Sequence, residues 1–405
     1  MFPAPGGSPY GVLVARDVPV PMRDGARLAT DVYRPAIGAD PAPGRFPVVL
    51  ARTPYDKTSP LALGGLVDAL VPRGFVVAAQ DLRGRHASEG LGDYFHVANP
   101  REGEDGFDAI EWLAAQPWSN GRIGTTGSSH AGTVQVVAAL HRPPHLAAVW
   151  PDVAPTDLHA HCCREGGAMA LHMFAALFLH AHDAQELRSD ARGRAVVHRA
   201  MERMPELVRE LRTFEPGASP LAPVPGLERV FFDYWRRGAD DDFWRQECCA
   251  PDRYLDRHAA VPALWTGGWY DPFSAATTGC FQGLSGRVPC ARLVMGPWTH
   301  GGMRNGASWA GDVDFGPAAA WGSDRYDAER TAWFERWLAG ARNGIETGPP
   351  VRIFVMGGGS GRRTAEGRLD HGGAWRDEFA WPIPAARPVE FFLRAGGRLT
   401  RERPP

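Results

Sequence analysis

Two adjacent serines and a histidine, Ser128, Ser129 and His130, stand between glycines in the segment GRIGTTGSSHAGTVQVVAAL, residues 121–140. A short apolar lead-in precedes them and a helix-like run follows. A serine on a sharp strand-to-helix turn is the nucleophile arrangement of many hydrolases. Small residues two positions before it and two or three after it let the backbone turn without side-chain clashes. The segment therefore predicts a serine nucleophile.

The glycine spacing selects between the two serines. With Ser129 as the nucleophile, glycine stands at positions −2 and +3 and alanine at +2. With Ser128, the β-branched Thr126 stands at −2, where the turn favours glycine. We therefore predict that Ser129 attacks and that Ser128 is a turn residue.

Two later residues have the order and the setting of catalytic partners. In α/β-hydrolases an acid and then a histidine follow the serine, each on a loop after a later strand. Asp271 follows an apolar run in LWTGGWYDPF, and His300 does so in LVMGPWTH. We expect His300 to take the proton of Ser129 and return it to the leaving group, while Asp271 orients the imidazole. Taken singly, each residue is also an ordinary loop-end residue, so the prediction depends on their joint order.

The elements that would position these residues alternate between strand and helix. The runs FPVVLAR and GFVVAAQD are typical of strands buried on both faces, and the helix-like LALGGLVDALVPR lies between them. A helix in EDGFDAIEWLAAQP and a strand in GRIGTTG then precede the serine turn. Upstream, Asp24-Gly25 between alternating segments indicates a hairpin. The alternation predicts a largely parallel sheet in an α/β domain.

The pattern changes after about residue 155. From 159 to about 244 the chain carries helical runs, which predicts a helical insertion. Strand–helix alternation resumes with VPALWTGGWYD, ARLVMGPWTH and the helical ERTAWFERWLAG. From about residue 349, VRIFVMGG and VEFFLRAGG indicate short antiparallel strands.

The composition narrows the class of protein. The 405 residues are 44% hydrophobic and 22% charged, which is typical of globular proteins. The net charge is −2, and the chain has no Lys/Arg tract of the kind that would indicate a nucleic-acid partner. The N-terminus lacks a secretory signal pattern, and the run AMALHMFAALFLHAH is too short and too rich in histidine to span a bilayer. The six cysteines form no zinc or redox motif. We expect a cytoplasmic protein with no cofactor and no metal.

Several segments along nearly the whole chain resemble one known family: VPMRDGARLATDVYRP, RTPYDK, QDLRGRHASEG, the G-x-S-x-x-G turn, GGWYD, GPWTH and WFERWLAG…NG…PPVRIFVMGG. These are similar to the cocaine-esterase-like and X-prolyl dipeptidyl-peptidase-like hydrolases (CocE/NonD type), which include α-amino-acid ester hydrolases and cephalosporin acylases. The resemblance implies an α/β-hydrolase domain (1–155 and 255–345), an inserted helical cap (156–254) and the beginning of a C-terminal jelly-roll-like β domain (346–405).

The resemblance also implies roles for individual residues. Ser129, Asp271 and His300 would form the catalytic triad. Tyr55 of RTPYDK would supply a phenolic hydroxyl to the oxyanion hole, and the backbone N–H of His130 would supply the second donor. Such donors meet the charge that develops on the carbonyl oxygen, and losing one typically costs about 10²–10³ in rate. The ring of His130 would then not be the base, although it is next to the serine in sequence.

The chain departs from the family pattern in several places. Members usually carry tyrosine at the position of His130. Asp271 is followed by Pro-Phe-Ser without the acidic residues that hold a substrate ammonium, which argues against α-amino esters. There is no room for the extra N-terminal domain of the large X-prolyl peptidases, and only 55 residues follow Pro350. We therefore expect a C-terminally truncated β domain.

The predicted function is hydrolysis of a small-molecule carboxylic ester or amide, with esters favoured because their leaving group is easier to expel. X-prolyl dipeptidyl-peptidase or acylase activity, and an inactive hydrolase-fold remnant or binding protein, remain alternatives. No membrane or nucleic-acid partner is expected, and a homo-oligomer stays open.

Two further patterns have competing interpretations. Metal-ligand residue types occur in HAHCC, HAHD and ADDD, but residues i and i+2 of a helix do not share a face, so HAHD in a helix is a poor chelate. Met169, Met173, Ala176 and Leu177 follow helical spacing. This spacing indicates cap packing rather than a cofactor site, and the alternative is that a few of them face an acyl pocket.

Overall fold

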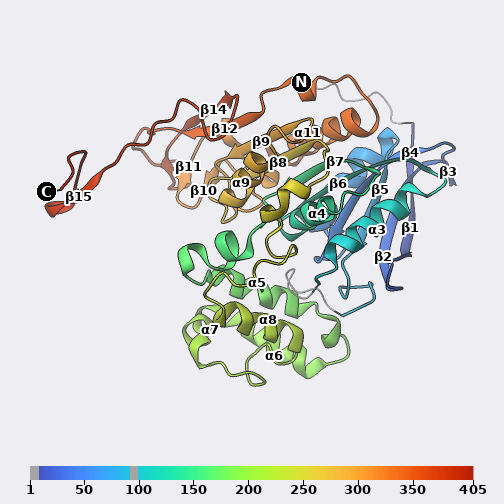
Figure 1. Ribbon diagram of the computed structural model, residues 1–405, viewed down its shortest axis with the longest axis horizontal. Coiled ribbons are helices and arrows are strands. Elements are labelled where there is room, and N and C mark those ends of the chain that lie inside the picture. The colour runs from blue at the N-terminus through green and yellow to red at the C-terminus, as the bar shows by residue number, and fades with distance from the viewer. Residues whose placement is uncertain (1–8, 92–98, 405) are drawn as a thin grey trace.

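The computed structural model describes residues 9–91 and 99–404. The N-terminal residues considered for a secretory signal therefore lie partly outside the described residues. A long sheet with helices on both faces forms the main body, a group of helices lies to one side of it, and a short hairpin near the C-terminus projects away from both (Figure 1).

Eleven strands make up the main sheet of the described residues, in the order β1-β2-β5-β4-β6-β7-β8-β9-β12-β14, with β3 paired to β2. The strands are β1 (Gly11–Pro21), β2 (Arg27–Ile37), β3 (Asp40–Pro41), β4 (Phe46–Thr53), β5 (Val76–Asp81), β6 (Ser119–Ser128), β7 (Leu146–Asp152), β8 (Ala263–Gly268), β9 (Ala291–Gly296), β12 (Val351–Met356) and β14 (Gly373–Glu378). From β5 to β12 the neighbouring strands are parallel. The hairpin expected at Asp24-Gly25 joins β1 and β2.

The central strands are buried on both faces because successive side chains alternate between two apolar layers. In β4, Val48 and Leu50 pack in one apolar cluster, and Val49 and Ala51 pack in the other. The first cluster includes residues of helices α3 (Glu102–Ala114), α4 (His130–Leu140) and α9 (Ser274–Leu284). The second includes residues of α2 (Leu66–Leu70) and α11 (Gly322–Leu338). This layered arrangement is the α/β-hydrolase fold expected from the sequence.

One predicted helix is broken. The run LALGGLVDALVPR forms α1 (Pro60–Leu63), α2 and the 3₁₀ turn Val71–Arg73 instead of one continuous crossover helix. Gly64 and Gly65 between them adopt left-handed conformations, with φ of 38° and 74°. Two consecutive left-handed residues end a right-handed helix, so the break lies at the glycine pair.

The segment between β7 and β8 is helical and has its own apolar core. Its helices are α5 (Leu171–His182), α6 (Ala191–Glu202), α7 (Met204–Glu210) and α8 (Pro225–Arg236). The two ends of the segment meet where they leave the sheet, because the Leu158 N–H donates to the Cys249 carbonyl at 2.8 Å and Arg253 pairs with Asp157 at 2.8 Å. We call residues 156–254 the cap below.

The C-terminal strands differ from the expectation of one antiparallel group. Strand β12 pairs parallel with β9, with Val351 opposite Leu293, so the main sheet continues beyond residue 345, the predicted end of the hydrolase segment. Strand β15 (Phe392–Arg394) pairs with β16 (Arg398–Thr400) in the projecting hairpin (Figure 1). Other short elements include α10 (Gly302–Asn305), β10 (Trp309–Ala310), β11 (Val313–Asp314) and β13 (Leu369–Asp370), as well as a π-helical turn (His159–Cys163) and short 3₁₀ turns such as Pro251–Arg257.

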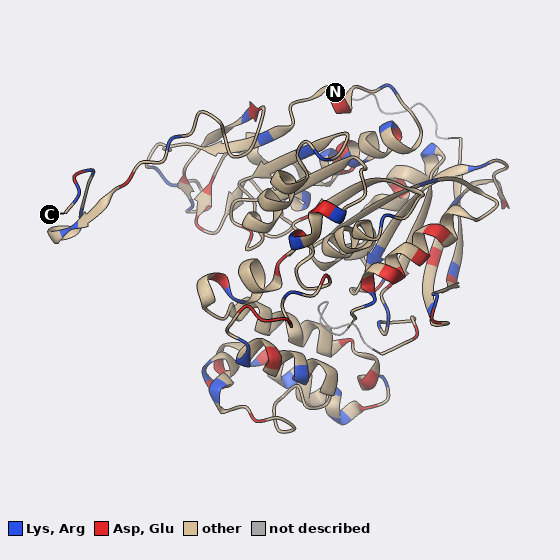
Figure 2. Ribbon diagram, viewed as in Figure 1, with Lys and Arg blue, Asp and Glu red and all other residues tan. Residues whose placement is uncertain are grey.

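Charged residues of both signs are spread over the sheet layer and the cap (Figure 2), in line with the small net charge. Within residues 9–91 and 99–404, no helix has the length and apolar character needed to cross a membrane.

Candidate active site

Four parallel strands end next to one cavity. Ser129 follows β6, Tyr55 follows β4 by two residues, Asp271 follows β8 and His300 follows β9. Because the carboxyl ends of parallel strands meet at the same edge of a sheet, residues far apart in sequence converge there. Tyr55, Ser129 and His300 line the cavity, and the carboxyl of Asp271 is buried behind His300.

Ser129 lies on a strained turn between β6 and α4. Its φ of 62° and ψ of −128° are unusual for a residue with a side chain, and such conformations cost about 1–3 kcal/mol unless the surroundings fix them. Here the backbone N–H of Ser129 donates to the Asp152 carbonyl at 2.9 Å, and the Ser129 carbonyl accepts from the Gly132 N–H at 2.8 Å. The strand–turn–helix context required for a nucleophile elbow is therefore present.

Gly127 and Gly132, on either side of Ser129, are required because other backbone atoms come close to them. A Cβ on Gly127, whose φ is 157°, would lie 2.7 Å from the Ala131 carbonyl oxygen. A Cβ on Gly132 would lie 2.8 Å from the Asp152 carbonyl oxygen. This is the physical reason for the glycine spacing that favoured Ser129 over Ser128.

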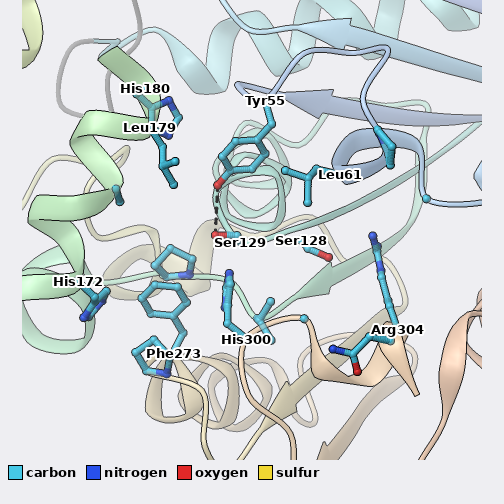
Figure 3. A pocket seen from close by; sticks show the side chains of 18 of the residues that line it. Tyr55, Leu61, Ser128, Ser129, His172, Leu179, His180, Phe273, His300 and Arg304 are labelled. Carbon is cyan, nitrogen blue, oxygen red and sulfur yellow. Dashed lines mark hydrogen bonds between the residues drawn. The ribbon is translucent and has the colours of Figure 1, made fainter. Parts of the chain in front are cut away.

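Tyr55 and the start of α4 supply two hydrogen-bond donors next to the serine. The Tyr55 hydroxyl donates to Ser129 Oγ at 3.2 Å and accepts from the backbone N–H of His130 at 3.4 Å (Figure 3). Burial raises the pKa of the Tyr55 phenol, so the hydroxyl keeps its proton and remains a donor. An oxyanion formed at Ser129 would lie within reach of both groups.

His300 is held by Asp271. The His300 Nδ1 lies 2.7 Å from Asp271 Oδ2, and the other carboxyl oxygen accepts from the Phe273 N–H at 2.7 Å. The Asp271 carboxyl is fully buried, whereas 43% of the His300 side chain is exposed. The far nitrogen of the imidazole points toward Ser129 (Figure 3). This arrangement suits a general base oriented by a carboxylate.

The ring of His130 lies in the protein interior. The residue is fully buried, and its ring centroid is 6.4 Å from that of His180 on α5, which in turn lies 5.6 Å from the Tyr55 ring. Burial lowers the pKa of His180 well below its ordinary value, so that imidazole is neutral. The contact of His130 with the Tyr55 hydroxyl is made by its backbone N–H.

The cavity has a volume of about 1020 Å³, which suits a small-molecule ligand. On the cap side it is lined by Cys162, His172, Met173, Ala176, Leu179 and Phe273. On the opposite side it is lined by Leu61, Ser128, Arg304, Asn305, Tyr326 and Asp327.

Sequence analysis missed Asp152, at the end of β7. Its carboxylate accepts from Ser128 Oγ at 3.1 Å, from Trp150 Nε1 at 3.1 Å and from the Tyr326 hydroxyl. Burial raises the pKa of this carboxyl. An acid directly after the apolar run LAAVWP has the same strand-end setting as Asp271, so that rule could have found Asp152.

Several residues considered at the sequence level have structural partners. Lys57, the only lysine, pairs with Asp17 at 2.8 Å and with Asp81 at 3.1 Å. In the segments considered for metal binding, Asp183 pairs with Arg85. Within the part of the chain that the structure describes, no group of three or more His, Cys, Asp or Glu residues could hold a metal ion.

Two family models match the chain. The model described as X-Pro dipeptidyl-peptidase (S15 family) matches residues 24–302, and that of the X-Pro dipeptidyl-peptidase C-terminal non-catalytic domain matches residues 343–405. Cocaine esterase of Rhodococcus sp. (strain MB1 Bresler) is 34% identical over 396 residues, which cover 95% of this chain and 63% of the esterase.

Solved structures share the fold. A CocE/NonD family hydrolase from Staphylococcus aureus superimposes with a TM-score of 0.64 at 21% identity, covering 96% of this chain and 60% of that one. An α-amino acid ester hydrolase gives a TM-score of 0.64 at 22% identity, covering 99% of this chain and 65% of that one. This chain thus spans just under two thirds of the length of these relatives.

Proposed function

The chain belongs to the X-Pro dipeptidyl-peptidase (S15) family, and from this premise we propose that it is a serine hydrolase that cleaves carboxylic esters through an acyl-enzyme. The observation that carries the proposal is the 2.7 Å contact between His300 Nδ1 and Asp271 Oδ2, with the imidazole turned toward a serine on a strained turn.

In the proposed reaction, Ser129 Oγ attacks the ester carbonyl while His300 takes its proton. The carbonyl oxygen becomes an oxyanion that accepts hydrogen bonds from the Tyr55 hydroxyl and the His130 N–H. When the tetrahedral intermediate collapses, His300 gives the proton to the departing alcohol oxygen. Water then attacks the acyl-enzyme by the same route and releases the acid.

Asp271 is proposed to act through His300. Its carboxylate accepts a hydrogen bond from Nδ1–H, which keeps the opposite nitrogen free to receive the serine proton, and it stabilises the imidazolium that forms. Its second oxygen is fixed by the Phe273 N–H, so the carboxylate cannot turn away from the ring without losing that bond.

Esters are favoured over X-prolyl peptides by the charges around the cavity. A peptide substrate of that kind carries an N-terminal ammonium, which needs a carboxylate partner. Among the cavity-lining residues, Asp183 pairs with Arg85, and Asp327 pairs with Arg330 at 2.5 Å. Both carboxylates are thus already compensated, and a second cation would compete with an arginine.

We also propose that the hydrolase unit consists of residues 1–155 and 255–345 together with strand β12, that residues 156–254 act as a cap forming one wall of the cavity, and that the residues after β12 belong to the C-terminal β domain. The parallel pairing of β12 with β9 and the separate apolar core of the cap support this division.

Labelling with a fluorophosphonate tests the proposal. The probe should modify the wild-type chain at Ser129, the Ser129→Ala variant should stay unlabelled, and the matched Ser128→Ala variant should retain the label. If the folded wild type is not labelled, the alternative of an inactive hydrolase-fold binding protein holds instead. Parallel assays with aryl esters and proline-containing dipeptide anilides decide between ester and peptide substrates.

A further inference from the structure

The two sides of the cavity have different chemistry. The cap side presents the apolar side chains of Met173, Ala176, Leu179 and Phe273 beside the polar His172, His180, His182 and Asp183, whose carboxylate pairs with Arg85. On the other side of His300, Arg304 extends past Ser128 toward Leu61 (Figure 3). A ligand that fills both sides would therefore be apolar at one end and meet a cation at the other.

Arg304 is held firmly in place. Its Nη2 donates to the Tyr326 hydroxyl at 3.0 Å and lies 3.5 Å from Asp152 Oδ2. The guanidinium also lies over the Tyr326 ring, 4.5 Å from its centroid. A fixed guanidinium loses little conformational freedom when a ligand binds, which favours its use in recognition.

Arg304 has a distant anionic partner, with 3.5 Å between its Nη2 and Asp152 Oδ2. Asp152, its nearest anion, is shared with Ser128, Trp150 and Tyr326. The other carboxylate nearby, Asp327, is bound by a second cation, Arg330, which is 2% exposed and does not reach the cavity surface as Arg304 does.

Two donor groups of Arg304 remain unused. Within residues 9–91 and 99–404, neither Nε nor Nη1 has a hydrogen-bond partner, and because Nε is buried, Nη1 is the one of the two that a ligand can reach. Nη1 lies against Gly64, where a Cβ would come within 2.9 Å, at a residue that also lines the cavity. The side chain is 21% exposed. A half-buried cation with a spare donor at a cavity wall is suited to an anionic ligand group.

We propose that Arg304 is a specificity-determining residue that binds a carboxylate on the half of the substrate lying away from the cap. The inference rests on the proposed ester hydrolysis, and it adds the substrate class: esters with an apolar group on one side of the scissile bond and a carboxylate on the other. Charge-assisted hydrogen bonds from a planar guanidinium favour a carboxylate over its neutral amide analogue.

Matched esters test the inference. One pair, 3-acetoxybenzoate and 3-acetoxybenzamide, places the carboxylate or its neutral analogue on the alcohol half. The other pair, 4-nitrophenyl 4-carboxybenzoate and 4-nitrophenyl 4-carbamoylbenzoate, places it on the acyl half. For one of the two pairs, the kcat/KM ratio of charged to neutral ester should be about 10-fold or more higher in the wild type than in Arg304→Gln. The responding pair identifies the half that contacts Arg304.

Variants separate a specific contact from a general effect of charge. Arg304→Lys keeps the cation but not the planar donors, so its ratio should be intermediate. Arg325→Gln removes the same charge from a residue on α11 that does not line the cavity and pairs with none of its carboxylates, so its ratio should match the wild type. Because each ratio is taken within one variant, losses of folding or overall activity cancel. Equal ratios in wild type and Arg304→Gln for both pairs, or an equal fall in Arg325→Gln, would overturn the inference.

Binding without turnover distinguishes this inference from the proposed function. Calorimetry on Ser129→Ala, which keeps the cavity, should show tighter binding of the charged than of the neutral member of the responding pair, and the difference should disappear in Ser129→Ala/Arg304→Gln. If neutral esters are hydrolysed but no charge preference exists, only the Arg304 inference fails. If binding shows the preference but no ester is cleaved, only the proposed activity fails.

Discussion

The floor of the cavity and its cap wall meet at Ser129, but they are built differently. The floor consists of residues shortly after strands β4, β6, β8 and β9, and hydrogen bonds join Tyr55 to Ser129 and His300 to Asp271. The wall is mainly helix α5, which presents both apolar side chains and histidines and packs on the separate core of the cap. The floor can hold reacting atoms at fixed distances, whereas the wall mainly provides shape.

This difference leads to a testable contrast. Changes in the floor should lower the rate for every ester by a similar factor, because they alter the groups that act on the carbonyl. Changes in the wall should reorder the preference among esters with less effect on the best of them.

The largest effect is expected for His300. His300→Ala should lower kcat about 10⁴-fold or more for all esters, because the serine loses its base. His130→Gln is the matched comparison, because it changes the histidine next to the serine while keeping the backbone N–H, and it should cost less than about tenfold. Steady-state kinetics with several p-nitrophenyl esters check both. A loss in the His130 variant as large as that in the His300 variant would refute the assignment of the base.

Tyr55→Phe should lower kcat by about 10²–10³ with little change in KM, because the hydroxyl donates to charge that forms only in the transition state. Since burial raises the pKa of the phenol, wild-type kcat should not fall through Tyr55 ionisation up to about pH 10. A pH–rate profile of the wild type beside kinetics of the variant measures both effects. An unchanged kcat would remove Tyr55 from the oxyanion hole.

The junction between floor and wall should make stability depend on pH. Asp252 lies where the cap returns to the sheet, and burial, followed by the negative charge of Asp157, raises its pKa to about 7. The folded pKa lies above the unfolded value, so this contribution to stability is present in acid and lost as the pH rises through 7. Between pH 5 and 8 the free energy of unfolding should fall by about 2 kcal/mol from this group.

Urea denaturation of Asp252→Asn at both pH values checks this, because the variant should lose that part of the pH dependence. Asp256→Asn, at an exposed position on the 3₁₀ turn Pro251–Arg257 that also holds Asp252, serves as the control and should behave like the wild type. Equal pH dependence in wild type and Asp252→Asn would contradict the prediction.

The smallest effect is expected on the wall. Ala176→Phe fills the cap side of the cavity and should lower the kcat/KM ratio of p-nitrophenyl benzoate to p-nitrophenyl acetate by about tenfold. Ala175→Phe places the same bulk one residue earlier on α5, at a position that does not line the cavity, and should leave this ratio near the wild-type value. If kcat/KM falls by the same factor for both esters in Ala176→Phe, the substitution disturbs the catalytic groups rather than the fit of the acyl group in the cavity.

The two regions also differed in how well the sequence predicted them. The floor residues Ser129, Asp271 and His300 each follow a short apolar run, and such runs are local signals that can be found one at a time. The structure brings these positions together as expected. Asp152 has the same setting, at the end of a strand that the sequence analysis did not identify.

In the cap, the sequence showed the helical spacing of the apolar residues but not the direction in which each side chain points. Of the residues considered for cap packing or an acyl pocket, Met173 and Ala176 line the cavity, whereas Leu177 is buried in the cap core and Met169 packs against that core. The period of a helix defines a face, but the partner of that face depends on how the cap packs on the sheet.

By itself, the sequence determined the strand–helix alternation, the glycine-bounded serine turn and the two strand-end partners, because these depend on local backbone geometry and on the period of burial. Only the tertiary structure decided that β12 joins the main sheet, that His130 points its ring into the interior, and that Arg304 reaches the cavity with donors to spare. Those outcomes depend on contacts such as that of Tyr326 with Asp152, 174 residues apart, which no local pattern encodes.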